Sequence, residues 1–355
     1  MRSLWILTLL AAELATPCAG QDSSDESGSL RRYEAVVDST PIPKFSWQRY
    51  FTKDKFDRRI TFYISKLRQP VSEKLPLIVC VQGSGSQSVF LKHKDMIASG
   101  GPEAVIARDF RQQARVLVVE KPGVEFLVQP SRPGSSEEGT KEFNREFSLN
   151  RWVEAVNAAT QAAMKLDEID PARTLILGHS EGGQVACEVA AVNPKITHVA
   201  VMAGGGPTQV FDFLQLAREG KMYDPAQTPQ QRVDAFMADW KKVRNAPNAA
   251  DKFILGHSHL RWSSFTKSSP VAAIQKSKAR VFIAQGTDDT NSLPASAEVL
   301  YAELLAHGRD VTYERVEGGN HGFMTKDDKT GKGWSKTNGK AVRWFLGDFK
   351  QEGNK

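Results

Sequence analysis

The chain has 355 residues, of which 40% are hydrophobic and 25% charged, and this composition excludes a low-complexity or collagen-like protein. One large α/β domain, or one domain with an insertion, fits the length. The net charge of +6 comes from Lys and Arg residues that are scattered, with no run of five. This mild and dispersed charge argues against nucleic acid as a partner.

The N-terminus has the pattern of a secretory signal. Arg2 supplies a positive start, residues 4–12 form an apolar stretch too short to span a bilayer, and small residues lead up to Gly20. We therefore expect cleavage after Gly20 and a secreted or periplasmic protein without stable membrane insertion. A lipoprotein anchored through Cys18 is the alternative, although the preceding Thr16-Pro17 matches a lipidation box poorly.

Cleavage at that point leaves a polar leader and two cysteines. Residues 21–44 are predicted to be disordered, with order beginning near Phe45 and one domain covering residues 45–355. Cys80 and Cys187 each fall inside a predicted regular element. Two buried thiols are therefore favoured over a disulfide.

Strands and helices alternate along most of the chain. Continuous apolar runs are typical of strands that are buried on both faces. We predict strands over residues 59–65, 77–81, 115–120, 174–177, 196–202, 280–285 and 311–316, and helices over residues 149–166, 184–191, 295–307 and 335–349. This order predicts a doubly wound, mostly parallel α/β sheet that binds its ligand at the carboxyl ends of the strands.

Residues 207–276 interrupt this alternation. They contain helical patches at 211–218 and 231–243 and few strand signals, so we predict a helical cap inserted over the active site. We expect most of its aromatic residues to pack the cap onto the core, and one or two to line an acyl or aromatic-ring pocket. The candidates are Trp240, Phe253, Trp262 and Phe265.

A nucleophile motif follows the predicted strand 174–177. Residues 178–182 read Gly-His-Ser-Glu-Gly and fit the pattern G-x-S-x-G, and a helix of small residues comes next. In this strand–turn–helix context the serine sits in a strained turn with its hydroxyl exposed above the sheet. We therefore predict Ser180 as the nucleophile.

The chain also contains a near copy of this motif. Residues 176–180, Ile-Leu-Gly-His-Ser, recur as residues 254–258. The second copy lacks the closing glycine and is followed by Arg261-Trp262 instead of small residues. We interpret it as a coincidence and do not predict Ser258 as a nucleophile.

Three polar residues lie at the ends of predicted parallel strands, in the order Ser180, Asp289 and His321. A serine hydroxyl needs a base to remove its proton, and the base needs an anion that fixes its tautomer and stabilises its charge. These three residues provide all three groups, which predicts a catalytic triad.

The oxyanion formed by serine attack requires N–H donors that are already in place. The amide of Glu181, next to the nucleophile, is one candidate. The loop at residues 82–86, Gln-Gly-Ser-Gly-Ser, offers a second donor in the amide of Ser84 beside Gly83. The loop lacks the third glycine of a dinucleotide-binding loop and the Gly-Lys-Ser/Thr of a P-loop. The remaining alternative is a tight turn without a role in binding.

On these residues the chain resembles the α/β-hydrolase family over about residues 60–350. The resemblance rests on residues 178–183, Gly-His-Ser-Glu-Gly-Gly, on residues 286–289, Gly-Thr-Asp-Asp, and on residues 320–323, Asn-His-Gly-Phe. More narrowly, the motif is similar to that of the esterase and serine-peptidase branch. The family usually has His-Gly in the oxyanion loop, where this chain has Gln82-Gly83.

The resemblance implies hydrolysis of a small carboxylic ester, thioester or amide without a metal or organic cofactor. The family pattern places the acid three residues after Gly286, which selects Asp289 and leaves Asp288 as a turn residue that caps local N–H groups. A serine at the elbow argues against the dehalogenase and epoxide-hydrolase branches, which use aspartate there.

We expect a serine esterase, with a serine peptidase or amidase of the same fold as the alternative. A non-catalytic binding protein on this fold would usually lack a member of the triad, and none is missing here. The sequence does not indicate the oligomeric state.

Overall fold

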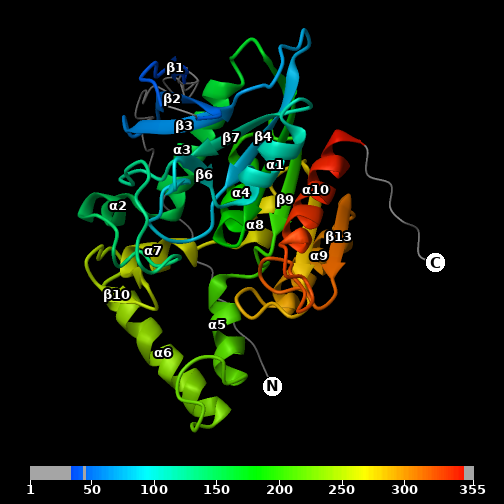
Figure 1. Ribbon diagram of the computed structural model, residues 1–355. Helices are drawn as coiled ribbons and strands as arrows, with labels where there is room; N and C mark the ends of the chain where they lie inside the picture. Colours follow the sequence, from blue (N-terminus) through cyan, green and yellow to red (C-terminus); the bar gives the residue numbers. More distant parts are fainter. Residues whose placement is uncertain (1–32, 43–44, 348–355) are drawn as a thin grey trace, which may run out of the picture. The chain divides into compact units, whose positions relative to one another are not determined.

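The computed structural model describes residues 33–42 and 45–347 (Figure 1). The predicted signal at residues 1–20 and the first part of the predicted leader, up to residue 32, lie outside the described residues. The leader was predicted too long, because β1 (Val36–Val37) pairs antiparallel with β2 (Trp47–Lys53). The outer edge of a strand offers unpaired N–H and C=O groups, and a polar segment can pair with them through its backbone alone.

A nine-stranded sheet forms the centre of the described part of the chain, in the order β1-β2-β3-β7-β4-β8-β9-β12-β13. The six neighbouring strands β7, β4, β8, β9, β12 and β13 run parallel. Strands β1, β2 and β3 extend the sheet with antiparallel pairing. Their bounds are β3 (Arg59–Ser65), β4 (Leu75–Val81), β7 (Arg115–Val119), β8 (Ile169–His179), β9 (His198–Met202), β12 (Arg280–Gly286) and β13 (Val311–Val316). The prediction of a mostly parallel α/β sheet is confirmed.

Helices cover both faces of this sheet. On β8, Ile176 contributes to the core on one face, whereas Leu175 and Leu177 contribute to the core on the other. The first face is covered by α3 (Leu149–Ala163), α4 (Glu181–Val192), α8 (Pro270–Ile274) and α9 (Pro294–Ala306). The second is covered by α1 (Pro102–Phe110) and α10 (Lys332–Leu346). The period-two alternation of buried strand residues therefore builds two cores.

Residues 207–269 form the cap, which is shorter than predicted. It contains α5 (Gln209–Arg218), α6 (Pro229–Asn245), the hairpin β10 (Phe253–Ile254)–β11 (His257–Ser258), and α7 (His259–Phe265). In Figure 1 α5 and α6 lie beside each other, away from the sheet. Helix α8 belongs to the core instead, because Ala273 and Ile274 are fully buried against it.

Two further elements near the site were not predicted. The hairpin β5 (Phe90–His93)–β6 (Met96–Ser99) is anchored by Phe90, which packs edge-on against Phe45 at 4.8 Å, and Ile97 packs against the same core. Helix α2 (Lys141–Glu146) is capped by Thr140, whose hydroxyl accepts from the amide of Phe143. Both elements are short, so their sequences carry little periodic signal.

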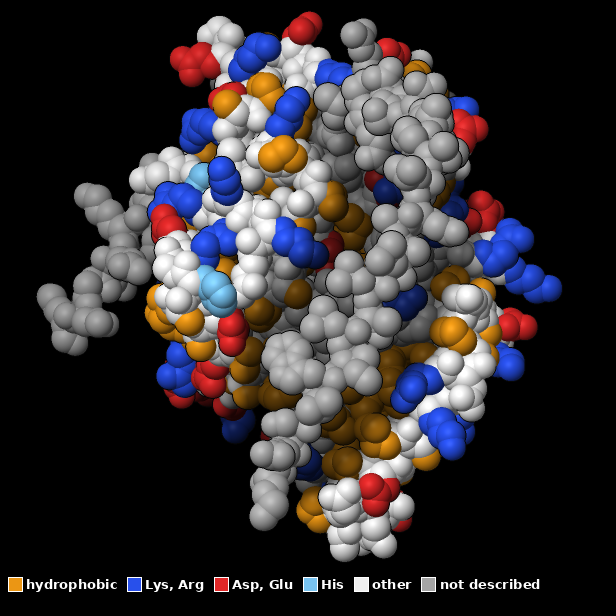
Figure 2. Space-filling model, turned by 180° about the vertical axis from the view of Figure 1, so that it is seen from behind, with side chains coloured by type: hydrophobic (Ala, Val, Ile, Leu, Met, Phe, Trp, Pro, Cys, Tyr) orange, Lys and Arg blue, Asp and Glu red, His pale blue; other side chains and the backbone are white. Residues whose placement is uncertain are grey.

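The cysteines and the surface agree with the sequence-based expectations. Cys80 and Cys187 are buried free thiols. On the face shown in Figure 2, Lys and Arg side chains are interspersed with Asp and Glu. Within the described residues, no helix combines the length and the apolar character needed to cross a membrane.

Candidate active site

Ser180 occupies a sharp turn between β8 and α4. Its backbone has φ 56° and ψ −128°, an uncommon conformation for a residue with a side chain. The turn brings helix and strand so close that a Cβ on Gly178 would lie 1.9 Å from the carbonyl oxygen of Gly182. The Gly-x-Ser-x-Gly spacing is therefore a steric requirement, and it leaves Ser180 lining two cavities.

His321 follows β13 and is held by Asp289, which follows β12. The Nδ1 atom of His321 lies 2.8 Å from Oδ2 of Asp289. Because Nδ1 of His321 faces Asp289, its other ring nitrogen, Nε2, is the atom left for Ser180. Ser180 and His321 line the same two cavities. Among the described residues Ser180 Oγ makes no hydrogen bond. In substrate-free enzymes the contact between the nucleophile and its base is often long.

The side chain of Asp289 is completely buried. Burial opposes its ionisation, but the hydrogen bond with His321 and those from the amides of Asn291 and Ser292 outweigh it. The pKa of Asp289 is consequently lowered from its ordinary value. Gln285 Nε2 also donates to Oδ2 at 3.0 Å. Asp289 is thus an anion in a fixed orientation, as the partner of a catalytic histidine must be.

Asp288 does not share this environment. It is exposed, and its backbone amide donates to Gly319 O at 2.9 Å. The expectation that Asp288 caps the turn is wrong, because Oδ1 of Asp289 accepts from the Asn291 amide at 2.8 Å and from the Ser292 amide at 3.1 Å. One inward-facing carboxylate serves both the turn and His321.

His179 also positions His321, a role that no pattern in the sequence indicated. Its Nε2 lies 2.9 Å from the carbonyl oxygen of His321, 142 residues away. A carbonyl can only accept, so Nε2 carries the proton and donates. Burial lowers the pKa of His179 to about 4, so the ring is neutral at pH 7. Trp334 packs edge-on against it at 4.8 Å, which fixes the ring.

Two backbone amides beside Ser180 have no acceptor among the described residues, those of Ser84 and Glu181. Glu181 is the first residue of α4, and the first amides of a helix have no intrahelical partner. Gly83 lies against the nucleophile, since a Cβ there would be 3.3 Å from Ser180 Cβ. Both predicted donors are therefore available to an oxyanion formed at Ser180.

The cap-side cavity encloses about 390 Å³ and contains Ser180 and His321. Cap residues Phe213, Leu255 and Trp262 form its apolar wall. Of the four cap aromatics singled out in the sequence, only Trp262 lines this cavity. Trp240 stacks on Phe236, Phe253 is 37% exposed, and Phe265 lies in the core.

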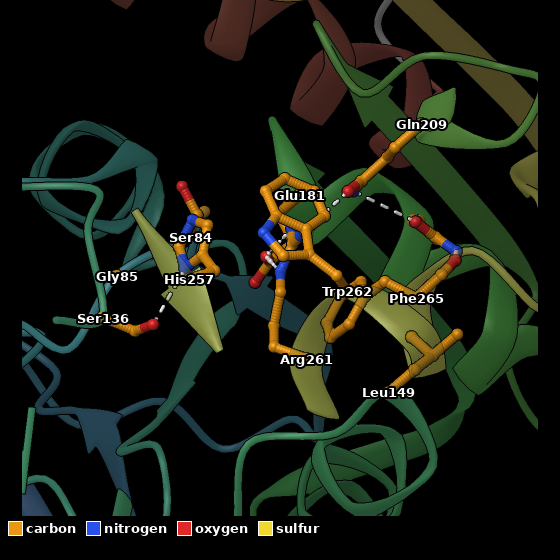
Figure 3. A network of polar contacts seen from close by, with 12 residues as sticks. Ser84, Gly85, Ser136, Leu149, Glu181, Gln209, His257, Arg261, Trp262 and Phe265 are labelled. Carbon is orange, nitrogen blue, oxygen red and sulfur yellow. Dashed lines mark hydrogen bonds and ion pairs between the residues drawn. The ribbon is translucent and has the colours of Figure 1, made fainter. Parts of the chain in front are cut away.

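A buried polar network joins the cap to the nucleophile turn (Figure 3). Arg261 of α7 pairs with Glu181: its Nε lies 3.0 Å from Oε2, and its Nη2 contacts the same oxygen. Its Nη1 donates to Oε1 of Gln209 at 2.8 Å. Removing one partner of such a buried pair leaves an uncompensated charge and costs about 3–5 kcal/mol. This pair, 80 residues apart, was not foreseen from the sequence.

A second cavity, the hairpin-side cavity, encloses about 370 Å³ and also contains Ser180 and His321. Its lining mixes polar side chains, such as Gln82 and Gln129, with apolar ones, such as Leu91. Most of its residues come from the oxyanion loop, the segment around β5 and β6, and the start of α1. The nucleophile therefore opens onto two small cavities of mixed polar and apolar lining.

A sequence model of the Alpha/beta hydrolase family matches residues 78–330. This range covers most of the chain and includes Ser180, Asp289 and His321. No curated protein matches the chain significantly.

Solved structures share the fold at low sequence identity. A puromycin-hydrolyzing peptidase from Mycobacterium tuberculosis aligns with 89% of this chain at 17% identity and a TM-score of 0.55. The acylaminoacyl peptidase of Pyrococcus horikoshii aligns with 92% at 14% identity and a TM-score of 0.55. The chain spans only 42% and 44% of those two proteins. An acetyl xylan esterase from Thermoanaerobacterium sp. aligns over 90% of this chain and 88% of its own, at 14% identity and a TM-score of 0.52.

Proposed function

Because the chain belongs to the alpha/beta hydrolase family, we propose that it is a serine hydrolase that cleaves a carboxylic ester through an acyl-enzyme on Ser180. The observation that carries the proposal is the grouping of Ser180, the His321–Asp289 pair and two unpaired amides at the carboxyl edge of one sheet. Each group meets one requirement of acyl transfer.

The first half of the reaction forms the acyl-enzyme. Ser180 Oγ attacks the ester carbonyl carbon while His321 Nε2 takes the hydroxyl proton, and Asp289 stabilises the resulting imidazolium. The carbonyl electrons move onto oxygen, where the amides of Ser84 and Glu181 donate to the oxyanion. When the oxyanion collapses, the bond to the alcohol breaks and His321 returns its proton to the leaving oxygen.

The second half repeats these steps with water. His321 Nε2 removes a proton from a water molecule, whose oxygen attacks the acyl carbon, and the same two amides stabilise the second oxyanion. Collapse breaks the bond to Ser180 Oγ, which regains a proton from His321. Protonated imidazole cannot act as base, so kcat/KM should be lower under acidic conditions than at neutral pH.

The dimensions of the site support a small ester over a polypeptide. Each cavity beside Ser180 falls in the range of about 300–1,000 Å³ typical of small-molecule sites. The cap closes one side and is attached by the buried Arg261–Glu181 pair, so a polypeptide would have to displace it. Two separate cavities beside the nucleophile suit the two parts of an ester, the acyl group and the alcohol.

The test combines active-site labelling with a substrate panel. A fluorophosphonate probe followed by peptide mapping should modify Ser180, and esters of short and medium acyl chains should be turned over. Matched aminoacyl amides should not be turned over; turnover of these amides would assign the peptidase alternative. Labelling that persists in Ser180→Ala would overturn the proposal.

We also propose that the enzyme is exported, on the basis of residues 1–20. The intact mass of the exported protein should correspond to a chain that begins at Gln21. Retention of Met1 would contradict export by cleavage, and a diacylglycerol on Cys18 would establish a lipoprotein.

A further inference from the structure

We propose that Lys121 is a positioning residue of the oxyanion hole: its ammonium holds the Gly83–Ser84 peptide so that the Ser84 amide faces the oxyanion. The inference rests on the function proposed above. Lys121 lies two residues after the end of β7 and is 1% exposed. Its Nζ lies 2.6 Å from Gly83 O and 2.8 Å from Gly85 O.

The environment of Lys121 is unusual for a buried ammonium. It forms no ion pair within 4.0 Å among the described residues, and the neighbouring carboxylate of Glu181 is engaged by Arg261. Burial lowers the pKa of Lys121 to about 8. The ammonium has therefore lost its water, and its direct hydrogen-bond partners are two carbonyl oxygens of the oxyanion loop. The ring of Phe147 lies 4.9 Å away.

The geometry of the peptide connects Lys121 to the reaction. The Gly83–Ser84 bond is trans, as are all peptide bonds in the described residues, so its C=O and N–H point in opposite directions. Because the Gly83 carbonyl is directed at Lys121, the Ser84 N–H points to the other side of the loop. That N–H has no acceptor among the described residues, and Gly83 packs against Ser180.

Lys121 also opposes the one rearrangement that would abolish the donor. A flip of the Gly83–Ser84 peptide would turn a carbonyl oxygen toward the oxyanion, and the partial negative charge of that oxygen would repel it. Two charge-assisted hydrogen bonds, one on each side of Ser84, hold the loop against this flip. The cation also polarises the peptide, which makes its N–H a stronger donor.

Arg232 provides a matched comparison within the same chain. It too is a buried cation bonded to backbone carbonyls, with Nε 2.7 Å from Ala217 O and Nη2 3.0 Å from Arg218 O. It joins α5 to α6 and does not line either cavity beside Ser180. If a buried cation bonded to carbonyl oxygens only stabilises the fold, substitution of Lys121 and substitution of Arg232 will both leave kcat nearly unchanged.

The experiment compares Lys121→Met with Arg232→Met in the full-length enzyme. For Lys121→Met we expect kcat to fall on the order of 10²-fold, as for loss of one oxyanion donor, with KM within about threefold. The Ki of a trifluoromethyl ketone, which forms an oxyanion on the serine, should rise by the same factor as kcat/KM falls. Arg232→Met should lower the melting temperature and keep kcat within about twofold.

An unchanged kcat and Ki in folded Lys121→Met would overturn the inference, as would an equal loss in Arg232→Met. If Lys121→Met does not fold, Lys121→Gln, whose shorter amide cannot reach both carbonyls, carries the same expectation. Ser180→Ala is assayed alongside. Its retention of activity would refute the proposed function itself, whereas its inactivity beside an active Lys121→Met would refute only the role of Lys121.

Discussion

The five residues Ile-Leu-Gly-His-Ser occur twice, at 176–180 and 254–258, and the two copies have different structures. The first copy ends β8, a central parallel strand, and Leu177 is fully buried. The second forms the hairpin β10–β11, and Leu255 is 41% exposed. The difference teaches that this sequence does not specify its own backbone, and that its surroundings decide between strand and turn.

The turn of the second copy explains the divergence. Leu255 and Gly256 both have positive φ, 48° and 79°, which is the pattern of a two-residue hairpin turn. In the first copy, Gly182 and the small residues after Ser180 allow helix α4 to approach the strand closely. The second copy has no glycine at the corresponding position. Both serines precede a helix, but only Ser258 caps its helix through its side chain.

The two serines accordingly do different work. Ser180 opens onto both cavities, whereas Ser258 is completely buried and its Oγ accepts from the Arg261 amide as the cap of α7. That cap begins the helix whose Arg261 side chain pairs with Glu181. The second copy thus helps to position α7, whose Arg261 holds Glu181 next to the nucleophile.

The largest effect should separate the two serines. Ser180→Ala should lower kcat on the order of 10⁶-fold, because it removes the nucleophile. Ser258→Ala should retain most of kcat and lose about 1 kcal/mol of unfolding free energy, the usual result of losing a helix cap. Steady-state kinetics and urea unfolding of both variants provide the measurement. Comparable inactivation of the two variants would contradict the assignment of Ser180 alone as the nucleophile.

The second prediction tests whether a distant partner makes Ser180 reactive. Asp289→Asn should lower kcat on the order of 10⁴-fold, because an amide favours the wrong tautomer of His321. The exposed neighbour Asp288 provides the control, and Asp288→Asn should stay within about tenfold of the parent. Thermal melts check that both variants are folded. If Asp288→Asn lowered kcat more than Asp289→Asn, the residue that orients His321 would be Asp288.

The third prediction concerns the glycine of each copy. Gly178→Ala should prevent folding or abolish activity, since its Cβ would lie 1.9 Å from a backbone oxygen. Gly256→Ala meets Ser135 no closer than 3.4 Å and should cost only about 1–2 kcal/mol, through its positive φ. Urea unfolding measures both. Equal losses of unfolding free energy in Gly178→Ala and Gly256→Ala would show that crowding at the nucleophile turn does not cause the structural difference between the two copies.

The smallest effect is a pH dependence of stability from the matched histidines. Burial lowers the pKa of His179 to about 4 and that of His257 well below its ordinary value. An unfolded histidine titrates near pH ~6.5, so below that pH the unfolded chain binds more protons than the folded one. The contribution of these two histidines to stability is therefore complete above about pH 6.5 and declines as the pH falls toward about 4.

Melting temperatures at several pH values between neutral and moderately acidic conditions measure this decline. His257→Asn, which keeps a side-chain group near the Ser136 hydroxyl that now faces Nδ1, should flatten it. The exposed His307 provides the control, and His307→Asn should leave the slope unchanged. An equally steep decline in His257→Asn would exclude that residue as a source.

The sequence alone determined the features that depend on local pattern. Buried runs of apolar residues separated by amphipathic helices required a mostly parallel sheet, and parallel topology brought the strand ends after β8, β12 and β13 to one edge. The placement of Ser180, Asp289 and His321 could be predicted for this reason. The spacing of glycines around Ser180 indicated the sharp turn, because its steric cause is local.

The tertiary structure alone decided which distant groups complete the site. His179 meets His321 across 142 residues and Arg261 meets Glu181 across 80, and no local pattern encodes such pairs. Lys121 belongs to the same group, because only the fold places its ammonium 2.6 Å from Gly83 O in the oxyanion loop. A charged side chain is identical in sequence whether solvated or buried, and only packing determines whether its charge is used.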